Sequence, residues 1–287
     1  MATTLEAEEA VTALFAGLFS EPASAYTDEE SGRTAVSIYR RKPPALGQVA
    51  ELRAGMRRIR RCGLDTGRSR ITVRQIRWQD WAESWKKHFK PLQIGAQLLI
   101  KPGWIRRRPR PGQAQVVLDP GLSFGTGRHP TTLFCLQQLV ACRDHLLPQA
   151  FLDIGTGSGI LVIAAAKLGY HPAHALDSDP QSVRVARANA RRNRVESQVR
   201  ISRRDLRRLP AGRIEYDLIC ANLTGDLLLE ERPRILGRLK SGGQLVLAGV
   251  LTAQFALLRT AYSAAGLELT CCRAEGGWHS ALFRRVS

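Results

Sequence analysis

The apolar and polar positions in the first quarter of the chain predict two amphipathic helices and two strands. Residues 5–19 and 45–61 place apolar side chains at helical spacing, with acids in the first turn of the former and arginines on the outer face of the latter. Residues 33–40 have the pattern of a strand, and residues 70–77 alternate as a half-buried strand does. We therefore expect a small αβαβ unit that can form its own domain.

From residue 150 onward, strand patterns alternate with helical patterns of ten to fifteen residues. The expected strands are residues 150–154, 174–177, 198–202, 216–222, 244–250, 267–272 and 278–285, after two short ones at 97–101 and 115–119. The expected helices are residues 159–169, 180–193, 224–236 and 253–265. This alternation predicts an α/β domain with a mostly parallel sheet and helices on both faces.

Between these two regions lies a segment rich in tryptophan. Trp78, Trp81 and Trp85 share one face of a predicted helix, which Pro91 ends. We interpret the three rings as a packing stripe that docks a linker helix between domains; the alternative is an exposed aromatic platform for nucleic acid. The predicted domains are thus residues 1–76, a helical linker over 77–92, and residues 93–287.

Composition narrows the class of protein. The longest strongly apolar run, residues 159–166, is far shorter than a membrane span requires, and the first residues are acidic where a signal peptide is basic. None of the six cysteines forms a C-x-x-C pair, so we expect reduced thiols and no metal site. The sequence predicts a soluble, cytoplasmic protein without a membrane partner.

The net charge of +18 is unevenly distributed, since residues 33–110 alone carry +17. A field of this kind favours an anionic partner, and contact with an RNA-containing partner through residues 33–110 is one interpretation. The alternative is a compositional bias, because arginine outnumbers lysine by 36 to 7. The sequence leaves both open.

A glycine-rich loop follows the strand that ends at residue 154. Gly155, Gly157 and Gly159 form a G-x-G-x-G pattern between that strand and a helix, a context in which glycines let the backbone approach a ligand closely. The dinucleotide fingerprint places its third glycine one position later, where this chain has Ile160. The loop therefore departs from that of a dehydrogenase.

An acidic residue ends the next strand. Asp177 lies 22 residues after Gly155, where a carboxylate can accept hydrogen bonds from both hydroxyls of a ribose. Asp179 is the competing acid, but Pro180 directly follows it, which is typical of a helix N-cap. Together with the glycine loop, Asp177 predicts an adenosine-bearing ligand, and its charge argues against a 2′-phosphate.

Two further polar residues end strands at the same predicted edge of the sheet. Asp205 follows the third strand of the set, near the place where an adenine would lie, or else pairs with a neighbouring arginine. Asn222 ends the fourth strand and can offer its amide oxygen to a ligand amine, or else bind turn backbone. Open α/β sheets bind ligands at this edge, which favours a functional role for Asn222.

Several stretches resemble one family of enzymes. LDIGTGSGIL, ALDSDP and ANLTGDLL are similar to successive motifs of Rossmann-like, S-adenosylmethionine-dependent methyltransferases. The turn-rich stretch DPGLSFGTGRHPTT, residues 119–132, resembles the signature of the ribosomal protein L-eleven methyltransferases. Residues 78–104 and 275–285 resemble other segments of that family, so the resemblance covers about residues 78–285.

The resemblance implies a fold and a binding site. The fold is a seven-stranded, mostly parallel Rossmann-like sheet, preceded by a small α+β substrate-recognition domain and a helical linker. The resemblance implies that Thr132, Gly155, Asp177 and Asn222 contact S-adenosyl-L-methionine. It also implies that the second glycine-rich segment covers the cofactor with three residues, namely Phe124, Gly125 and Gly127. A cover of this kind would exclude water from the transferred methyl group.

The resemblance also implies a reaction. The enzyme would methylate lysine side chains and the N-terminal α-amine of ribosomal protein L-eleven, free or on the large ribosomal subunit, and we expect a monomer. We assign Asn222 the catalytic role of orienting the amine. The alternatives are methylation of ribosomal RNA, although the run ANLT lacks the prolines of an N-P-P-Y motif, and methylation of another protein of the translation machinery. A binding module without activity is disfavoured by the intact glycine loop and by Asp177.

The sequence departs from the family pattern in two places. Arg128 stands where a small or neutral residue is usual. The family also begins with a strand before its first helix, whereas the helical pattern here starts almost at Met1. The second departure concerns recognition of the substrate more than catalysis.

Overall fold

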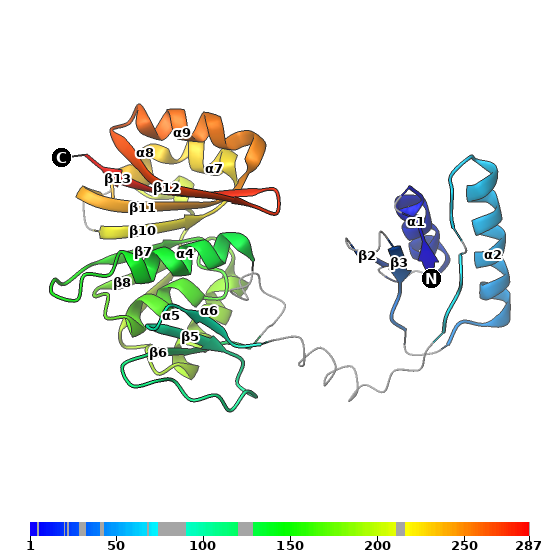
Figure 1. Ribbon diagram of the computed structural model, residues 1–287, viewed down its shortest axis with the longest axis horizontal. Helices are drawn as coiled ribbons and strands as arrows, with labels where there is room; N and C mark the ends of the chain where they lie inside the picture. The colour runs from blue at the N-terminus through cyan, green and yellow to red at the C-terminus, as the bar shows by residue number, and fades with distance from the viewer. Residues whose placement is uncertain are drawn as a thin grey trace. The chain divides into compact units, whose positions relative to one another are not determined.

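The computed structural model describes residues 1–4, 6–19, 21, 23–28, 33–40, 43–67, 69–73, 90–119, 129–210 and 216–286. The chain divides into two units, Met1–Lys86 and Lys87–Ser287 (Figure 1). All but residues 90–92 of the predicted linker, including Trp78, Trp81 and Trp85, lie outside the described residues. The predicted boundaries at 76 and 92 therefore stay a prediction.

The first unit contains a small antiparallel sheet and two helices. Strands β1 (Ala2–Thr3), β3 (Arg33–Ser37) and β2 (Ser24–Asp28) form the sheet in that order. Helices α1 (Glu8–Phe19) and α2 (Leu46–Arg61) share one core with it, to which Val11, Phe15, Val36, Leu52 and Met56 contribute. The apolar stripes that predicted the two helices are therefore the faces that are buried.

The strand content of this unit differs from the prediction in three ways. A two-residue strand, β1, does precede the first helix, and the polar segment that forms β2 was missed. The predicted strand over 70–77 is wrong for residues 70–73, which belong to no strand. Arg70 offers its carbonyl to the backbone N–H of Ala2 at 3.2 Å, so this segment follows β1 without forming a ladder. Residues 74–77 lie outside the described part.

The second unit has a seven-stranded sheet, as predicted. Its order is β12 (Leu267–Glu275), β13 (Trp278–Arg285), β11 (Leu239–Leu251), β10 (Tyr216–Asn222), β7 (Phe151–Ile154), β8 (Ala173–Asp177) and β9 (Val199–Arg203). The five strands from β11 to β9 run parallel to one another, and β13 runs antiparallel to both of its neighbours, β11 and β12. The predicted α/β class with a mostly parallel sheet is confirmed.

Helices cover both faces of this sheet (Figure 1). One layer consists of α4 (Pro130–Ala141), α5 (Ile160–Lys167) and α6 (Pro180–Arg192), and the other of α7 (Gly225–Glu230), α8 (Arg232–Leu236) and α9 (Phe255–Ser263). Alternate residues of β10 serve the two cores: Leu218 and Cys220 face the first layer, Ile219 and Ala221 the second. Such a strand reads as a continuous apolar run, as the sequence does.

Smaller elements complete the unit. Strands β4 (Leu92–Ile94), β5 (Leu98–Lys101) and β6 (Ala114–Val117) form a third sheet that packs into the first core, and β4 was not predicted. The predicted helix over 224–236 is divided at Glu231, where α8 begins with Arg232 and carries Pro233 in its first turn. Two short 3-10 helices, η1 (Leu206–Arg208) and η2 (Thr252–Gln254), follow β9 and β11.

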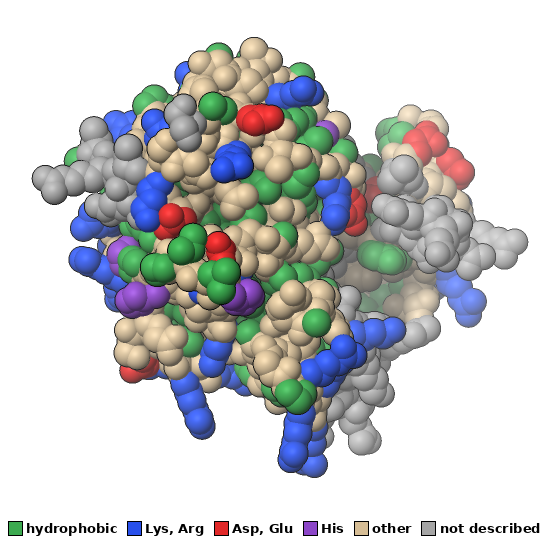
Figure 2. All heavy atoms as spheres, turned by 60° about the vertical axis from the view of Figure 1, so that its left-hand side comes forward, with side chains coloured by type: hydrophobic (Ala, Val, Ile, Leu, Met, Phe, Trp, Pro, Cys, Tyr) green, Lys and Arg blue, Asp and Glu red, His purple; other side chains and the backbone are tan. Residues whose placement is uncertain are grey.

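The surface and the thiols agree with the composition. Figure 2 shows Lys and Arg side chains projecting at many points of one face, with fewer Asp and Glu among them. All six cysteines are free. Within the described residues, no helix has both the length and the hydrophobicity that crossing a membrane requires.

Candidate active site

The predicted site residues meet at the carboxyl edge of the parallel strands. Ile154 of β7 is in register with Leu176 of β8 and with Ala221 of β10. The residues that follow these three positions are Gly155, Asp177 and Asn222. The parallel register therefore brings three of the residues predicted from separate motifs to one edge of one sheet.

The glycine loop lies close to two neighbouring elements. Gly155 has φ +77°, and a Cβ atom there would lie 2.6 Å from the Cδ2 of Leu223, directly after β10. Gly159, at φ +82°, begins α5, and its Cβ would lie 3.0 Å from the Cβ of Ala186 on α6. Both positions therefore require glycine for the backbone conformation and for close approach. The loop bends sharply from β7 into α5 without projecting side chains at these points.

Asp177 is fixed by backbone donors. Its Oδ2 accepts a hydrogen bond from the N–H of Gly157 at 2.9 Å, and its Oδ1 accepts one from the N–H of Asp179 at 3.0 Å. Each carboxylate oxygen keeps acceptor capacity beyond these bonds. The carboxylate is therefore held beside the glycine loop in an orientation that leaves lone pairs for a ligand.

Asp179 and Asp205 both act as local caps. Asp179 is the N-cap of α6, with Pro180 following it, as predicted. The Ser182 hydroxyl and the backbone N–H groups of Gln181 and Ser182 donate hydrogen bonds to the Asp179 carboxylate. These bonds, the one from the Ser182 hydroxyl most of all, lower the pKa of the Asp179 carboxyl. Asp205 caps η1 by accepting from the N–H of Arg207 at 3.0 Å. Contact between Asp205 and an adenine stays a prediction.

Asn222 is connected to α4 through a hydroxyl group. Its Nδ2 donates to the Oγ1 of Thr131 at 3.3 Å, and the same Oγ1 lies 2.8 Å from the Nδ1 of His129. On the other side, a Cβ atom added to Gly249 would lie only 2.9 Å from the Oδ1 of Asn222. The amide is thus bounded by Thr131 and by the backbone of β11, with its nitrogen engaged in a hydrogen bond.

Two buried oxygens at this edge have no hydrogen-bond partner within the described residues. One is the Oγ1 of Thr132, a residue that is 2% exposed, and the other is the Oδ1 of Asp153, which is fully buried. Unpaired buried polar atoms are costly, and a polar ligand at this edge would offer them partners. The residues present therefore fit a polar ligand bound over β7 and α4.

Asp153 is a feature that the sequence reasoning missed. Its Oδ2 accepts a hydrogen bond from the Thr156 hydroxyl at 2.6 Å. Burial raises the pKa of its carboxyl to about 7, and the nearby Asp177 carboxylate raises it further, against that hydrogen bond. The signal available in the sequence was a single carboxylate inside the apolar strand FLDI. Thr131 was also missed, because its partner lies in another motif.

The last hairpin closes one end of the site. The His129 ring meets the edge of the Trp278 ring, with centroids 5.3 Å apart, and a Cβ at Gly276 would lie 3.9 Å from the Cγ of Pro130. The β12–β13 turn therefore contacts the beginning of α4. Phe124, Gly125 and Gly127, the predicted cover, and Arg128 lie outside the described residues, so the cover stays a prediction.

Comparison with known proteins identifies the family. The family model described as "Ribosomal protein L11 methyltransferase (PrmA)" matches residues 7–286. A ribosomal protein L11 methyltransferase of Trichlorobacter lovleyi is 43% identical over 212 residues, which are 72% of this chain and 68% of that protein. One from an Exiguobacterium species is 39% identical over 241 residues, 82% of this chain and 75% of that protein.

A solved structure agrees with the sequence matches. The crystal structure of ribosomal protein L11 methylase from Lactobacillus delbrueckii subsp. bulgaricus superposes with a TM-score of 0.62 at 28% identity. The match covers 69% of this chain and all of that one. The glycine loop, the strand-end Asp177 and Asn222, and the helix that begins at Pro130 all fall inside the range of the family model. The chain belongs to the ribosomal protein L11 methyltransferase family.

Proposed function

We propose that this protein transfers methyl groups from S-adenosyl-L-methionine to amino groups of ribosomal protein L11, namely lysine side chains and the N-terminal α-amine. The family match over residues 7–286 and the names of the relatives support the protein substrate. The observation that carries the choice of amines is the Asn222 amide, whose nitrogen is engaged by Thr131 at the carboxyl edge of the sheet. Its oxygen is then the atom that can receive an N–H from the acceptor.

S-adenosyl-L-methionine is the cofactor, and when bound it supplies an electrophilic methyl group on a sulfonium centre. Asp177 would accept hydrogen bonds from the ribose hydroxyls with the lone pairs that Gly157 and Asp179 leave available. The unpartnered Thr132 hydroxyl and the backbone of the loop from Gly155 would bind its polar groups. Phe124, Gly125 and Gly127 would cover the site and exclude water.

The acceptor amine has to be neutral before it can attack. Removing its proton at pH 7 costs about 4.6 kcal/mol for a lysine with a pKa near 10.4, and about 1.4 kcal/mol for an α-amine near 8. The α-amine is therefore the easier acceptor. Desolvation under the cover would lower the pKa of a lysine amine and reduce this difference.

Asn222 orients the neutral amine in this proposal. Because its Nδ2 donates to Thr131, the amide is held in one orientation and its Oδ1 accepts a hydrogen bond from the acceptor nitrogen. This bond fixes the direction of the nitrogen lone pair. Most of the acceleration then comes from proximity and alignment rather than from a dedicated base.

The first unit would recognise the substrate. We assign this role to residues 1–76, joined by a linker over 77–92 to the methyltransferase domain at 93–287, in a monomeric, cytoplasmic protein. Helix α2 exposes five arginines that a neighbouring ribosomal RNA could contact, namely Arg53, Arg57, Arg58, Arg60 and Arg61. This contact would assist recognition when the substrate is on the large subunit.

Methyl transfer to isolated substrates tests the proposal. Isotope-labelled methyl groups should enter isolated ribosomal protein L11 and not isolated ribosomal RNA, and mass spectrometry should locate them on amines. Asn222→Ala should reduce turnover far more than it weakens cofactor binding measured by calorimetry. Labelling of the RNA alone would contradict the choice of substrate, and unchanged turnover in Asn222→Ala would exclude the role of Asn222.

A further inference from the structure

The positive charge of residues 111–287 is concentrated at one edge of the sheet. Residues 180–210 carry ten arginines and two carboxylates, whereas the rest of residues 111–287 carries twelve basic and twelve acidic residues. All ten arginines are exposed. A general preference for arginine would not leave the rest of residues 111–287 balanced. The net +8 of residues 111–287 therefore belongs to one local surface, formed by α6, β9 and η1.

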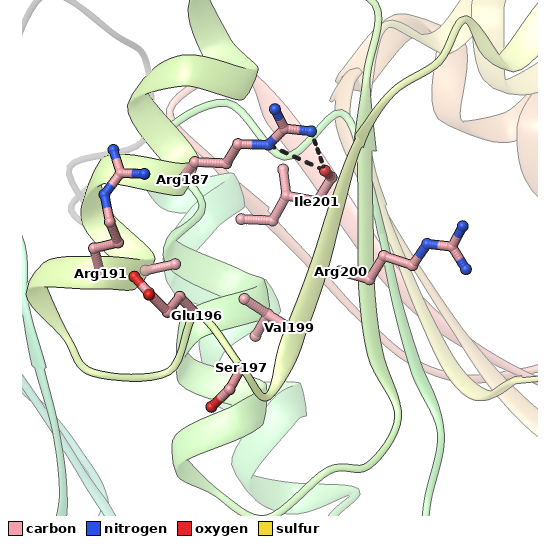
Figure 3. A pocket seen from close by; sticks show the side chains of 8 residues that line it. Arg187, Arg191, Glu196, Ser197, Val199, Arg200 and Ile201 are labelled. Atoms are coloured by element: carbon pink, nitrogen blue, oxygen red, sulfur yellow. Dashed lines mark hydrogen bonds between the residues drawn. The ribbon is translucent and has the colours of Figure 1, made fainter.

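A groove runs along this surface between α6 and the edge strand β9 (Figure 3). It has a volume of about 460 Å³, and Ala190, Val199 and Ile201 are among the residues that line it. Figure 3 shows Arg187 and Arg191 on the helix side and Arg200 on the opposite side of the strand. Guanidinium groups thus flank the free edge of the sheet on both sides.

Most of these arginines have no carboxylate partner. Arg187 donates from Nη2 to the carbonyl of Ile201 at 2.8 Å, which holds its side chain against the edge of the sheet. Arg192 forms an ion pair with Asp119 at 2.6 Å. Within the part of the chain that the structure describes, the other nine form no ion pair, although the charge of Arg203 helps to lower the pKa of the Asp179 carboxyl. The charges of Arg191 and Arg200 are available to an external anion.

We infer that the α6–β9 edge binds the sugar–phosphate backbone of an RNA duplex. Exposed arginines flanking a groove suit phosphates, which guanidinium groups bind with two parallel hydrogen bonds. Proteins that bind single strands stack bases on aromatic rings, and residues 180–210 contain no Phe, Tyr, Trp or His. Binding through the backbone of a duplex requires no such ring.

The choice of RNA rests on the proposed function, because a ribosomal protein substrate is encountered beside ribosomal RNA. The surface lies on the methyltransferase unit, Lys87–Ser287. It would give the enzyme a second, sequence-independent contact with the large subunit. Free substrate protein would not use it.

Fluorescence anisotropy with a labelled RNA duplex of about 20 base pairs tests the inference. The full-length protein should bind it with an affinity that falls steeply between about 50 and 200 mM salt. Arg191→Glu/Arg200→Glu, two exposed residues whose side chains form no hydrogen bond with other described residues, should weaken binding at least tenfold and reduce the salt slope by about two. The matched control is Arg259→Glu/Arg284→Glu, with the same charge change on α9 and β13.

Two readouts separate this inference from the proposed function. Methylation of free ribosomal protein L11 should be equal in the wild type and in both double variants, which also shows that the variants fold. Equal RNA affinity of the two double variants would overturn the RNA surface and leave the proposed function intact. If the protein bound an acidic peptide more tightly than the RNA duplex, the inference of an RNA surface would be overturned in favour of a protein partner. If the wild-type enzyme did not methylate ribosomal protein L11, that result would contradict the proposed function.

Discussion

The side-chain amide of Asn222 donates a hydrogen bond to the hydroxyl of Thr131, at 3.3 Å, across 91 positions of the sequence. It joins the end of β10 to the first turn of α4, and the same hydroxyl contacts the Nδ1 of His129 at 2.8 Å. Two motifs that the sequence presents separately are therefore one arrangement in space. The orientation of the Asn222 amide, which we propose accepts a hydrogen bond from the substrate amine, therefore depends on Thr131, a residue outside the motif of Asn222.

Thr131→Val should reduce turnover about fivefold, because it removes the hydroxyl and leaves the Asn222 amide free to rotate; one such hydrogen bond contributes about 1 kcal/mol. Thr131→Ser should restore most of the activity. Steady-state kinetics with ribosomal protein L11 measures the effect, and calorimetry should find cofactor affinity nearly unchanged.

The adjacent threonine provides the control. Thr132→Val removes a hydroxyl that is buried but not bonded to Asn222, so it should weaken cofactor binding and affect turnover at saturation much less. Equal kinetic profiles of the two valine variants would show that the Thr131–Asn222 bond has no separate role.

Gly249→Ala should impair catalysis through contact with Asn222. Its Cβ would lie 2.6 Å from the carbonyl oxygen of Leu223 and 2.9 Å from the Oδ1 of Asn222, so the amide has to move. We expect a loss of turnover of tenfold or more, measured at saturating cofactor, together with about 1–2 kcal/mol of destabilisation from the left-handed backbone.

Gly242→Ala separates these two effects. Gly242 has φ +72° in the same strand, and a Cβ there meets nothing within 4 Å. This variant should be destabilised by a similar amount and keep its turnover. If both variants lost activity in parallel with stability, displacement of Asn222 would not be the cause.

Asp177→Asn should weaken binding of S-adenosyl-L-methionine by roughly tenfold to a hundredfold. In this variant the side-chain NH2 group would face one of the two backbone N–H groups that donate to the carboxylate in the wild type, so one of these hydrogen bonds is lost. A hydrogen bond to a charged acceptor contributes about 1.5–3 kcal/mol. Calorimetric titration measures the affinity. Asp179→Asn, in contrast, keeps an equally good N-cap and should bind the cofactor as the wild type does. A similar loss in both variants would remove the distinction between the two acids.

Asp153 should make stability depend on pH. Because burial raises the pKa of its carboxyl to about 7, the folded protein binds a proton that the unfolded chain has released, between about pH 4 and pH 7. This carboxyl therefore lowers the free energy of unfolding as pH rises through that range, with no further change above it. Asp153→Asn has no such carboxyl, so this fall in the free energy of unfolding should be absent from the variant.

The measurement is denaturant unfolding of both proteins without cofactor at several pH values. Relative to the wild type, Asp153→Asn should gain about 2.7 kcal/mol between pH 5 and pH 8, since the loss runs over about two pH units and each corresponds to about 1.4 kcal/mol. A difference between the two proteins that is independent of pH would contradict the raised pKa of Asp153.

The sequence was sufficient to predict the large sheet and the ends of its strands. Apolar runs followed by glycine or acid placed Gly155, Asp177 and Asn222 at the ends of β7, β8 and β10, because parallel strands buried on both faces leave a clear pattern. The segment that forms β2 was missed, since its short polar sequence SAYTD carries no alternation of that kind. Periodicity predicts buried strands better than edge strands.

The contacts around Asn222 could not be predicted in the same way. Thr131 reaches it across 91 positions, and Gly249 approaches it because the ladder between β11 and β13 changes register between Leu247 and Val250. Neither a long-range hydrogen bond nor a bulge leaves a periodic signal. The buried carboxylate of Asp153 is similar, because its environment depends on how the layer of α4, α5 and α6 packs on β7.

The position of β13 in the sheet has a consequence for biosynthesis. This strand is the last to be translated among those of the sheet, yet it lies between β11 and β12. Until residues 278–285 have emerged from the ribosome, β11 has one open edge and β12 has no neighbour at all. An unpaired strand edge pairs readily with strands of other chains. A stalled nascent chain would therefore be prone to aggregate through the edges of β11 and β12 that β13 covers in the finished enzyme.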